Sequence, residues 1–176
     1  MKVVVASGHL TDRPDRASPR FPESAVPRVR RQIARALDEI GLARGDLLIC
    51  GGARGADLLA AEEALRRGAS VRLCLASPRA SFVPESVALA GTDWSDRFDT
   101  VAKCSEIRVV PPPPEDTSVY EATNDWMLEQ ALAEPADERH ALLVWDGRPG
   151  DGAGGTGHFS ERASSAGLPL VVIHPL

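Results

Sequence analysis

The residues best suited to bind an anion form the run Gly51-Gly52-Ala53-Arg54-Gly55-Ala56-Asp57, which directly follows the apolar segment 46–50. Glycines allow a ligand to approach the backbone closely, and free N–H groups at the start of a helix attract an anion. Arg54 offers a bidentate contact to a phosphate group. Asp57 suits the positive end of a helix by itself, and it is also suited to accept a hydrogen bond from a ribose hydroxyl. The run predicts a phosphate site, and its alternative is an ordinary tight turn.

A second glycine-rich run, residues 145–161, also joins an apolar segment to a helical pattern. Its candidate ligand contacts are Asp146, Gly152, Gly154, Gly155 and Thr156, of which the glycines expose amides and Thr156 offers a hydroxyl. In an open α/β sheet, ligands bind beyond the carboxyl ends of the strands, near the point where the strand order reverses. We therefore expect the two runs to face one crevice and to bracket one phosphorylated ligand. The alternative for this run is a flexible surface loop.

The tripeptide Ser7-Gly8-His9 ends the first apolar segment and is a third candidate contribution. Gly8 lets a ligand approach, and His9 is able to donate a hydrogen bond or to titrate near neutrality. A purely structural role for His9 remains open. No pair of Cys or His residues has the spacing of metal ligands, so we expect no metal site and no bound cofactor.

Short apolar segments alternate with longer amphipathic patterns along the whole chain. The predicted buried strands are 2–7, 46–50, 70–75, 106–110, 140–145 and 168–173. The predicted helices are 26–40, closed by Gly41, then 55–67, 93–104, 118–133 and 157–166. Repeated strand–helix alternation indicates an α/β fold, a doubly wound and mostly parallel Rossmann-like sheet in three layers. The length suits one domain over residues 1–176.

Composition excludes several classes of partner. The 20 basic and 25 acidic residues give a net charge of −5, which argues against bulk nucleic-acid binding through a basic face. No apolar run approaches the roughly 18 residues that a membrane span requires, and the first residues lack a signal-peptide pattern, so we expect a cytoplasmic protein without a membrane partner. The odd number of cysteines (Cys50, Cys74 and Cys104) favours reduced core thiols over disulfides.

The paired glycine turns resemble the SLOG superfamily, which includes the LOG phosphoribohydrolases and the DprA-like and YspA-like proteins. The similarity spans nearly the whole chain. It is greatest to uncharacterised bacterial modules that stand alone or are joined to signalling proteins with cyclase or TPR regions, on the segments 7–9, 15–22, 94–98 and 145–152. The resemblance implies a Rossmann-like fold that binds a nucleotide or a nucleotide-derived molecule.

Residues 153–161 fit the LOG motif PGGxGTxxE, with Ala153 in place of the proline and His158 in place of the threonine. The resemblance therefore implies a catalytic role for Glu161, which falls on the motif's glutamate. The arginine–lysine pair of the enzymes would fall within residues 120–127, where no basic residue occurs. SLOG binding modules carry an Arg-Asn pair there, and this chain keeps the asparagine, Asn124, as a ligand contact. Binding fits the pattern better than catalysis.

Three functional hypotheses follow. The first is binding or sensing of a nucleotide or nucleotide-derived phosphorylated ligand at the carboxyl ends of the strands. The second is a LOG-like phosphoribohydrolase that cleaves the N-glycosidic bond of a nucleoside monophosphate, with Glu161 positioning water or stabilising an oxocarbenium-like ribosyl centre. The third is an interaction scaffold in a signalling system that binds no ligand.

The sequence also suggests, less specifically, a base-stacking site and a dimer surface. The aromatic residues Phe21, Trp94 and Phe98 are candidates for stacking on a base, and the alternative is that they belong to the core. The helix 118–133, with Trp126 and Met127, is a candidate surface for a homodimer, and the alternative is that its apolar stripe faces the core.

Overall fold

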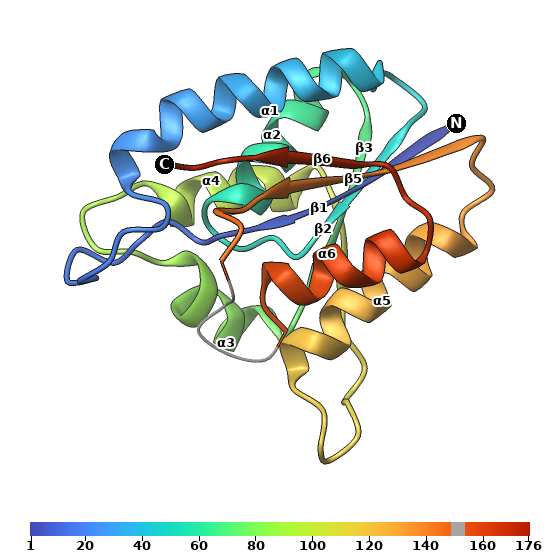
Figure 1. Ribbon diagram of the computed structural model, residues 1–176. Helices are drawn as coiled ribbons and strands as arrows, with labels where there is room; N and C mark the ends of the chain where they lie inside the picture. Colours follow the sequence, from blue (N-terminus) through green and yellow to red (C-terminus); the bar gives the residue numbers. More distant parts are fainter. Residues whose placement is uncertain (149–153) are drawn as a thin grey trace.

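The computed structural model describes residues 1–148 and 154–176 (Figure 1). Within these residues six strands form one sheet in the order β4-β3-β2-β1-β5-β6, and every neighbouring pair is parallel. The strands are β1 Lys2–Gly8, β2 Leu47–Cys50, β3 Ser70–Leu75, β4 Glu106–Val109, β5 Glu138–Val144 and β6 Leu170–Ile173. The predicted parallel, doubly wound sheet is confirmed.

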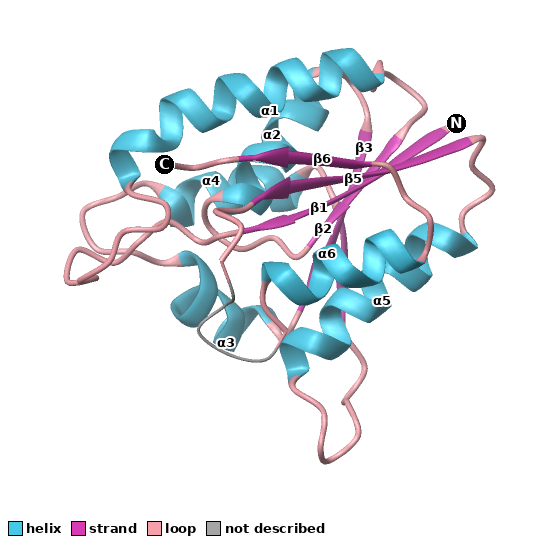
Figure 2. Ribbon diagram, viewed as in Figure 1, coloured by secondary structure: helices cyan, strands magenta, loops and turns pink. Residues whose placement is uncertain are grey.

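Helices cover both faces of the sheet, which gives three layers (Figures 1 and 2). They are α1 Val26–Ile40, α2 Ala56–Arg66, α3 Arg79–Phe82, α4 Trp94–Lys103, α5 Val119–Ala133 and α6 Thr156–Ser165. Helices α1, α2 and α4 share one core with the side chains of Val4 and Ala6, whereas α5 and α6 share the other with Val3 and Val5. This division follows from the two-residue period of a strand. None of the described helices is long and apolar enough to cross a membrane.

Local sequence explains where two of the helices begin and end. In α1 the buried residues Val29, Ile33 and Leu37 recur every fourth position, and Gly41 ends the helix in a left-handed conformation with φ of 74°. Helix α5 begins with a capping box, in which the Ser118 hydroxyl accepts from the first turn and the Glu121 carboxylate accepts from the Ser118 N–H group.

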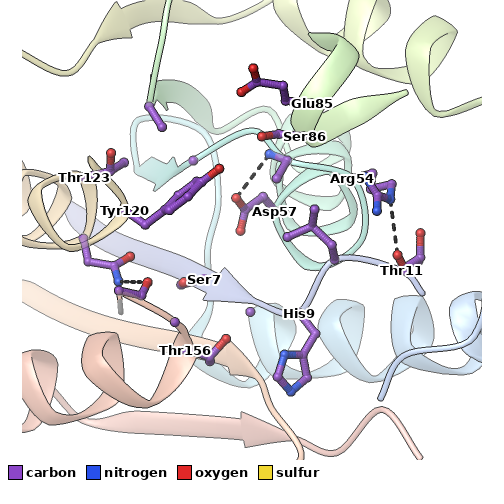
Figure 3. Close-up of a pocket in the computed structure, with 18 of the residues that line it drawn as sticks. Ser7, His9, Thr11, Arg54, Asp57, Glu85, Ser86, Tyr120, Thr123 and Thr156 are labelled. Atoms are coloured by element: carbon purple, nitrogen blue, oxygen red, sulfur yellow. Dashed lines mark hydrogen bonds between the residues drawn. The ribbon is translucent and has the colours of Figure 1, made fainter. Parts of the chain in front are cut away.

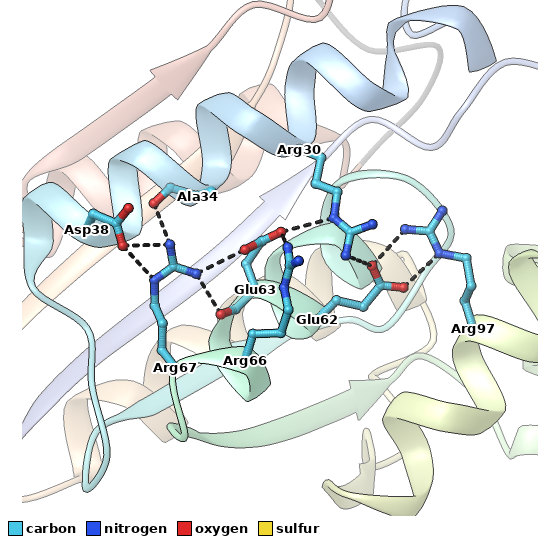
Figure 4. A network of polar contacts seen from close by, with 8 residues as sticks. All are labelled: Arg30, Ala34, Asp38, Glu62, Glu63, Arg66, Arg67 and Arg97. Carbon is cyan, nitrogen blue, oxygen red and sulfur yellow. Dashed lines mark hydrogen bonds and ion pairs between the residues drawn. The ribbon is translucent and has the colours of Figure 1, made fainter.

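An ion-pair network joins α1, α2 and α4 on the outer surface (Figure 4). Glu63 of α2 is 2% exposed and pairs with three arginines, Arg30, Arg66 and Arg67. The neighbouring Glu62 accepts two hydrogen bonds, of 2.7 and 2.8 Å, from Arg97 of α4. Because α2 supplies both carboxylates, the network holds this helix, and the turn that precedes it, against its neighbours.

Two expectations about burial are wrong. Strand β4 is exposed rather than buried, with Ile107 38% and Val109 43% accessible, because it is the edge strand and pairs only with β3. Cys104 is also exposed, since it follows the last turn of α4, whereas Cys50 and Cys74 lie in the core as expected.

One segment without a predicted element is helical. Residues 79–87 form α3 and a π-helical turn, Val83–Val87, which bury Phe82 and Val87. The turn contains Pro84 and is too short for a 3.6-residue period to be recognised.

The strand order places a reversal between β1 and β5. After β1 the chain adds β2, β3 and β4 on one side, then returns to place β5 and β6 on the other side of β1. Helix α2 follows β2 on one face, and α6 follows β5 on the other. Both helices therefore begin at the edge of the sheet where a ligand is expected.

Candidate functional site

A cavity of about 820 Å³ lies at the carboxyl ends of β1, β2 and β3 (Figure 3). Its lining includes many predicted contacts: Ser7, Gly8, His9, Gly51, Ala53, Arg54, Asp57, Asn124, Gly154, Gly155 and Thr156. The structure thus brings the end of β1 and both glycine-rich runs around one space. Five predicted residues are not among those that line it: Gly52, Gly55, Ala56, Asp146 and Glu161. Gly152 lies outside the described residues.

Close packing requires glycine at position 8, apart from any access that it gives to a ligand. A Cβ atom at Gly8 would lie 2.6 Å from the Val144 carbonyl oxygen of β5 and 2.7 Å from the Ala56 Cβ of α2. A side chain here would push apart two elements that form the wall of the cavity, so glycine sets the distance between them.

The β2–α2 turn does not offer the free amides that its sequence predicts. The Ala53 N–H group donates to the Asp57 carboxylate at 3.2 Å. The N–H groups of Arg54 and Ala56 donate to the carbonyl oxygens of Ser86 and His9, at 3.0 and 3.2 Å. The expectation of a free amide cradle is wrong at these three positions, because the turn satisfies its donors within the protein.

The Asp57 side chain folds back over the β2–α2 turn and accepts a hydrogen bond from it. A Cβ atom at Gly51 would lie 2.8 Å from Asp57 Oδ2, so glycine leaves room for the carboxylate to fold back over the turn. Burial raises the pKa of Asp57 to about 7, and hydrogen bonds from the backbone of residues 51–53 act in the opposite direction. Of the two roles open to Asp57 in the sequence, the structure shows the carboxylate at the positive end of its own helix.

The other glycines of this turn serve backbone geometry. Gly52 has φ of 80° and faces the core, where Leu75 lies 3.2 Å from the position of a Cβ atom. Gly55 has φ of 89°, and a Cβ atom there would lie 2.7 Å from the His9 carbonyl oxygen. Both positions therefore favour glycine whether or not a ligand binds.

The Arg54 guanidinium is buried beside the cavity, and the whole residue is 4% exposed. Its Nε donates to the Thr11 carbonyl oxygen at 3.2 Å (Figure 3). Within residues 1–148 and 154–176, its Nη1 has no hydrogen-bond partner, and neither has the buried Thr11 hydroxyl. Burial lowers the pKa of Arg54.

Asp146 anchors the loop after β1 rather than lining the cavity. Arg20 donates two hydrogen bonds to its carboxylate, at 2.9 and 2.7 Å, and His9 Nε2 lies 3.1 Å from Oδ1. Arg20 holds the pKa of Asp146 well below its usual range, and burial lowers the pKa of His9. The cluster ties the segment 9–20 to the end of β5, so the predicted contact at Asp146 acts on the shape of the site.

The β5–α6 turn is held against α5. Asn124 Nδ2 donates to the Gly154 carbonyl oxygen at 2.7 Å. Gly154 has φ of 81°, and a Cβ atom there would lie 2.6 Å from the Tyr120 carbonyl carbon and closer still to the Glu121 nitrogen. Gly155 is the N-cap residue of α6 and has no side chain with which to cap its first turn, and Thr156 follows at the cavity wall. The start of α6 is the helix end suited to an anion.

Several lining residues carry no clear sequence signal. Thr11, Phe82, Glu85, Ser86, Tyr120 and Thr123 also line the cavity. Tyr120 is 50% exposed on the first turn of α5, and its ring points into the cavity (Figure 3). The sequence alone does not show this exposure, although the capping-box pattern does place Tyr120 on the first turn of a helix. Ser86 lies in the π-helical turn, which periodicity does not reveal.

The structure decides between the alternatives for two groups of apolar side chains. Phe21, Trp94 and Phe98 are fully buried and do not line the cavity, so they belong to the core and are not placed to stack on a base. Met127 is also buried and faces the cavity, and Trp126 packs against the core, as the core-facing alternative for this helix predicted.

Glu161 lies on an exposed position of α6. The buried residues of this helix are Thr156, Phe159 and Ala163, so Glu161 falls on the other face. In the described parts of the chain, no group of three His, Cys, Asp or Glu residues could hold a metal ion.

The comparisons with known proteins concern the fold. No protein-family model matches the chain, and no curated protein matches it. The solved structure of TM1055, a structural genomics target, is 17% identical with a TM-score of 0.50, over 97% of this chain and 72% of that chain. This likeness shows that the chain shares the fold of TM1055 over nearly its whole length, in agreement with the predicted parallel Rossmann-like sheet. DprA from Streptococcus pneumoniae is 16% identical with a TM-score of 0.33, over 97% of this chain and 58% of that chain.

Proposed function

We propose that this protein binds a nucleotide or a nucleotide-derived phosphorylated molecule in the cavity, as a binding or sensing module. The observation that carries the proposal is the convergence of the β1 end and both glycine-rich runs on one space of about 820 Å³, where the strand order reverses. This volume suits a small organic ligand, and this edge of an open α/β sheet is where such ligands bind.

The phosphate group would bind at the start of α6. Gly155 leaves the N–H groups of the first turn without a side-chain cap, and the Thr156 hydroxyl stands at the same wall. The helix dipole adds a positive field at this end. Asn124 acts as a positioning residue, because its hydrogen bond to Gly154 holds the turn in place.

The base and sugar would occupy the more apolar part of the cavity. Cys74, Ala76, Phe82 and Met127 supply apolar surface there, and Tyr120 adds an exposed aromatic ring. A flat ring next to small apolar side chains suits a nucleobase. Asp57 and Ser86 add polar groups that would orient the ligand.

The hydrolase hypothesis gains no support from this geometry. It rests on a carboxylate at Glu161, and that residue is exposed and not among those that line the cavity. The scaffold hypothesis differs from the proposal in a measurable way, because it predicts that changes in the cavity leave binding properties unaltered.

Isothermal titration calorimetry with AMP, GMP, CMP, UMP, cyclic nucleotides and ADP-ribose, each paired with its unphosphorylated nucleoside, tests the proposal. We expect at least one nucleotide to bind about tenfold or more tightly than its nucleoside, since charge-assisted hydrogen bonds contribute roughly 1.5–3 kcal/mol. Thr156→Val should weaken that binding, whereas Thr100→Val, a matched change on the exposed face of α4, should not. Equal affinity for nucleotide and nucleoside, or no binding at all, would contradict the proposal.

A further inference from the structure

The two buried polar atoms without hydrogen-bond partners in the described residues occur in neighbouring residues of the cavity wall. They are Arg54 Nη1 and Thr11 Oγ1, and the Arg54 Nε donates to the Thr11 carbonyl oxygen. Both residues are nearly inaccessible, at 4% and 1% exposed. A buried guanidinium and a buried hydroxyl that lack partners both cost free energy, which a ligand atom can recover.

The carboxylates that most influence Arg54 are engaged elsewhere. Asp12 Oδ2 accepts from the N–H groups of Arg20 and Phe21, at 2.8 and 2.9 Å. Glu23 accepts from the Trp94 indole at 2.7 Å. Within residues 1–148 and 154–176, Arg54 forms no direct ion pair. Asp12 and Glu23 act on its charge only at longer range, and the nearby Arg13 opposes them.

The Arg54 group is separate from the start of α6. Strands β2 and β5 lie on opposite sides of β1, so the ends of these strands are two strand spacings, roughly 10 Å, apart. The two helices that begin there also cover opposite faces of the sheet. Figure 3 shows Arg54 and Thr11 together on one side of the cavity and Thr156 on another. The two places therefore suit two separate anionic groups.

We infer that the cavity holds a second anionic subsite, formed by Arg54 and Thr11, and that its ligand carries two anionic groups separated by at least a sugar. The inference rests on the proposed function, which places the first anionic group at the start of α6. Arg54 supplies a charge-assisted hydrogen bond to the second group, and the Thr11 hydroxyl donates another. A nucleoside bisphosphate is the simplest ligand of this class.

The test compares adenosine and guanosine 5′-monophosphates with the corresponding 3′,5′-bisphosphates by calorimetry at fixed ionic strength. The wild-type protein should bind the better bisphosphate at least about tenfold more tightly than its monophosphate. Arg54→Gln and Thr11→Val should each reduce this advantage and leave monophosphate affinity within about twofold. Arg35→Gln is the matched control, because it removes the same charge from an exposed position of α1.

Thermal melting of the ligand-free variants gives a second readout. Thr11→Val removes an unpartnered hydroxyl, so it should not lower the melting temperature. Arg54→Gln removes an unpaired buried charge together with the hydrogen bond to the Thr11 carbonyl oxygen, so these effects should offset and change the melting temperature little. A drop of several degrees for both variants would show structural roles and overturn the inference. A bisphosphate advantage that is absent in the wild type, or that survives both substitutions, would overturn it as well and leave the proposed function standing. If no phosphorylated nucleoside binds, the proposed function fails and the inference fails with it.

Discussion

The Asp57 carboxylate accepts a hydrogen bond of 3.2 Å from the backbone N–H group of Ala53, four residues earlier in the chain. The turn between β2 and α2 therefore has the glycine pattern of a phosphate-binding turn, yet an acid from its own helix occupies the position of the anion. This relationship shifts the expected phosphate position to the start of α6, where glycine is the N-cap residue.

Asp57 should make the stability of the protein depend on pH. Its pKa is raised to about 7 in the folded protein, from an ordinary value near 3.8, so the folded state binds a proton that the unfolded state lacks between these values. The free energy of unfolding should therefore fall as pH rises from about 4 to about 7, by at most about 4 kcal/mol from this group.

Asp57→Asn isolates this effect, because an amide keeps an acceptor for the Ala53 N–H group but does not ionise. Urea denaturation between pH 5 and pH 8 should show the variant gaining stability relative to the wild type as pH rises. Other titrating groups cancel in this difference. A difference that stays constant across the range would refute the assignment.

Gly154 should tolerate no side chain. Gly154→Ala places a Cβ atom 2.6 Å from the Tyr120 carbonyl carbon and also imposes a φ of 81° on alanine. Gly91→Ala is a matched control, because Gly91 has φ of 76° and open space around it. The control should lose about 1–2 kcal/mol of unfolding free energy from backbone strain alone, and Gly154→Ala should lose at least about 1 kcal/mol more. Equal losses, measured by urea denaturation, would argue against tight packing of this turn on α5.

The network around Glu63 should stabilise the packing of α1 on α2. Glu63→Gln leaves three arginines without this carboxylate and should cost about 1–3 kcal/mol, between the values for exposed and buried pairs. The control is Glu39→Gln, which breaks an exposed pair with Arg35 and should cost less than about 0.5 kcal/mol. Thermal and urea denaturation would measure both losses. A negligible effect of Glu63→Gln would show that these ion pairs do not contribute to the free energy of unfolding.

The three thiols should differ in reactivity. Cys104 is exposed, whereas burial raises the pKa of Cys74 to about 12 and raises that of Cys50 as well. A colorimetric thiol reagent should modify one cysteine rapidly in the native protein and the other two only after denaturation. Cys104→Ser should abolish the rapid phase. Rapid modification of two or three thiols would contradict the described burial.

The strands and the main helices were predictable because their signals are local. Six short apolar segments and the four-residue spacing in α1 depend only on neighbours in the chain. The exposure of β4 was not predictable, because the identity of the edge strand depends on the strand order. The helical segment 79–87 escaped prediction because it is short and contains Pro84.

The sequence predicted which backbone segments reach the cavity, but it did not predict the hydrogen bonds that their residues form. Both glycine-rich runs reach the cavity, as their positions after two strands indicated. The acceptors that satisfy the β2–α2 turn include His9 and Ser86, which come from distant segments. The outward position of Glu161 has a local cause, because Phe159 and Ala163 mark the buried face of α6. Helical phase therefore separates this residue from the motif that suggested its role.

The most direct test of the central claim is a crystal structure of the protein with the tightest-binding nucleotide. We expect the phosphate group at the first turn of α6, within hydrogen-bond distance of the Thr156 hydroxyl, and the base beside Tyr120. A nucleotide bound outside the cavity, or a phosphate group on the β2–α2 turn in place of the Asp57 carboxylate, would contradict this account.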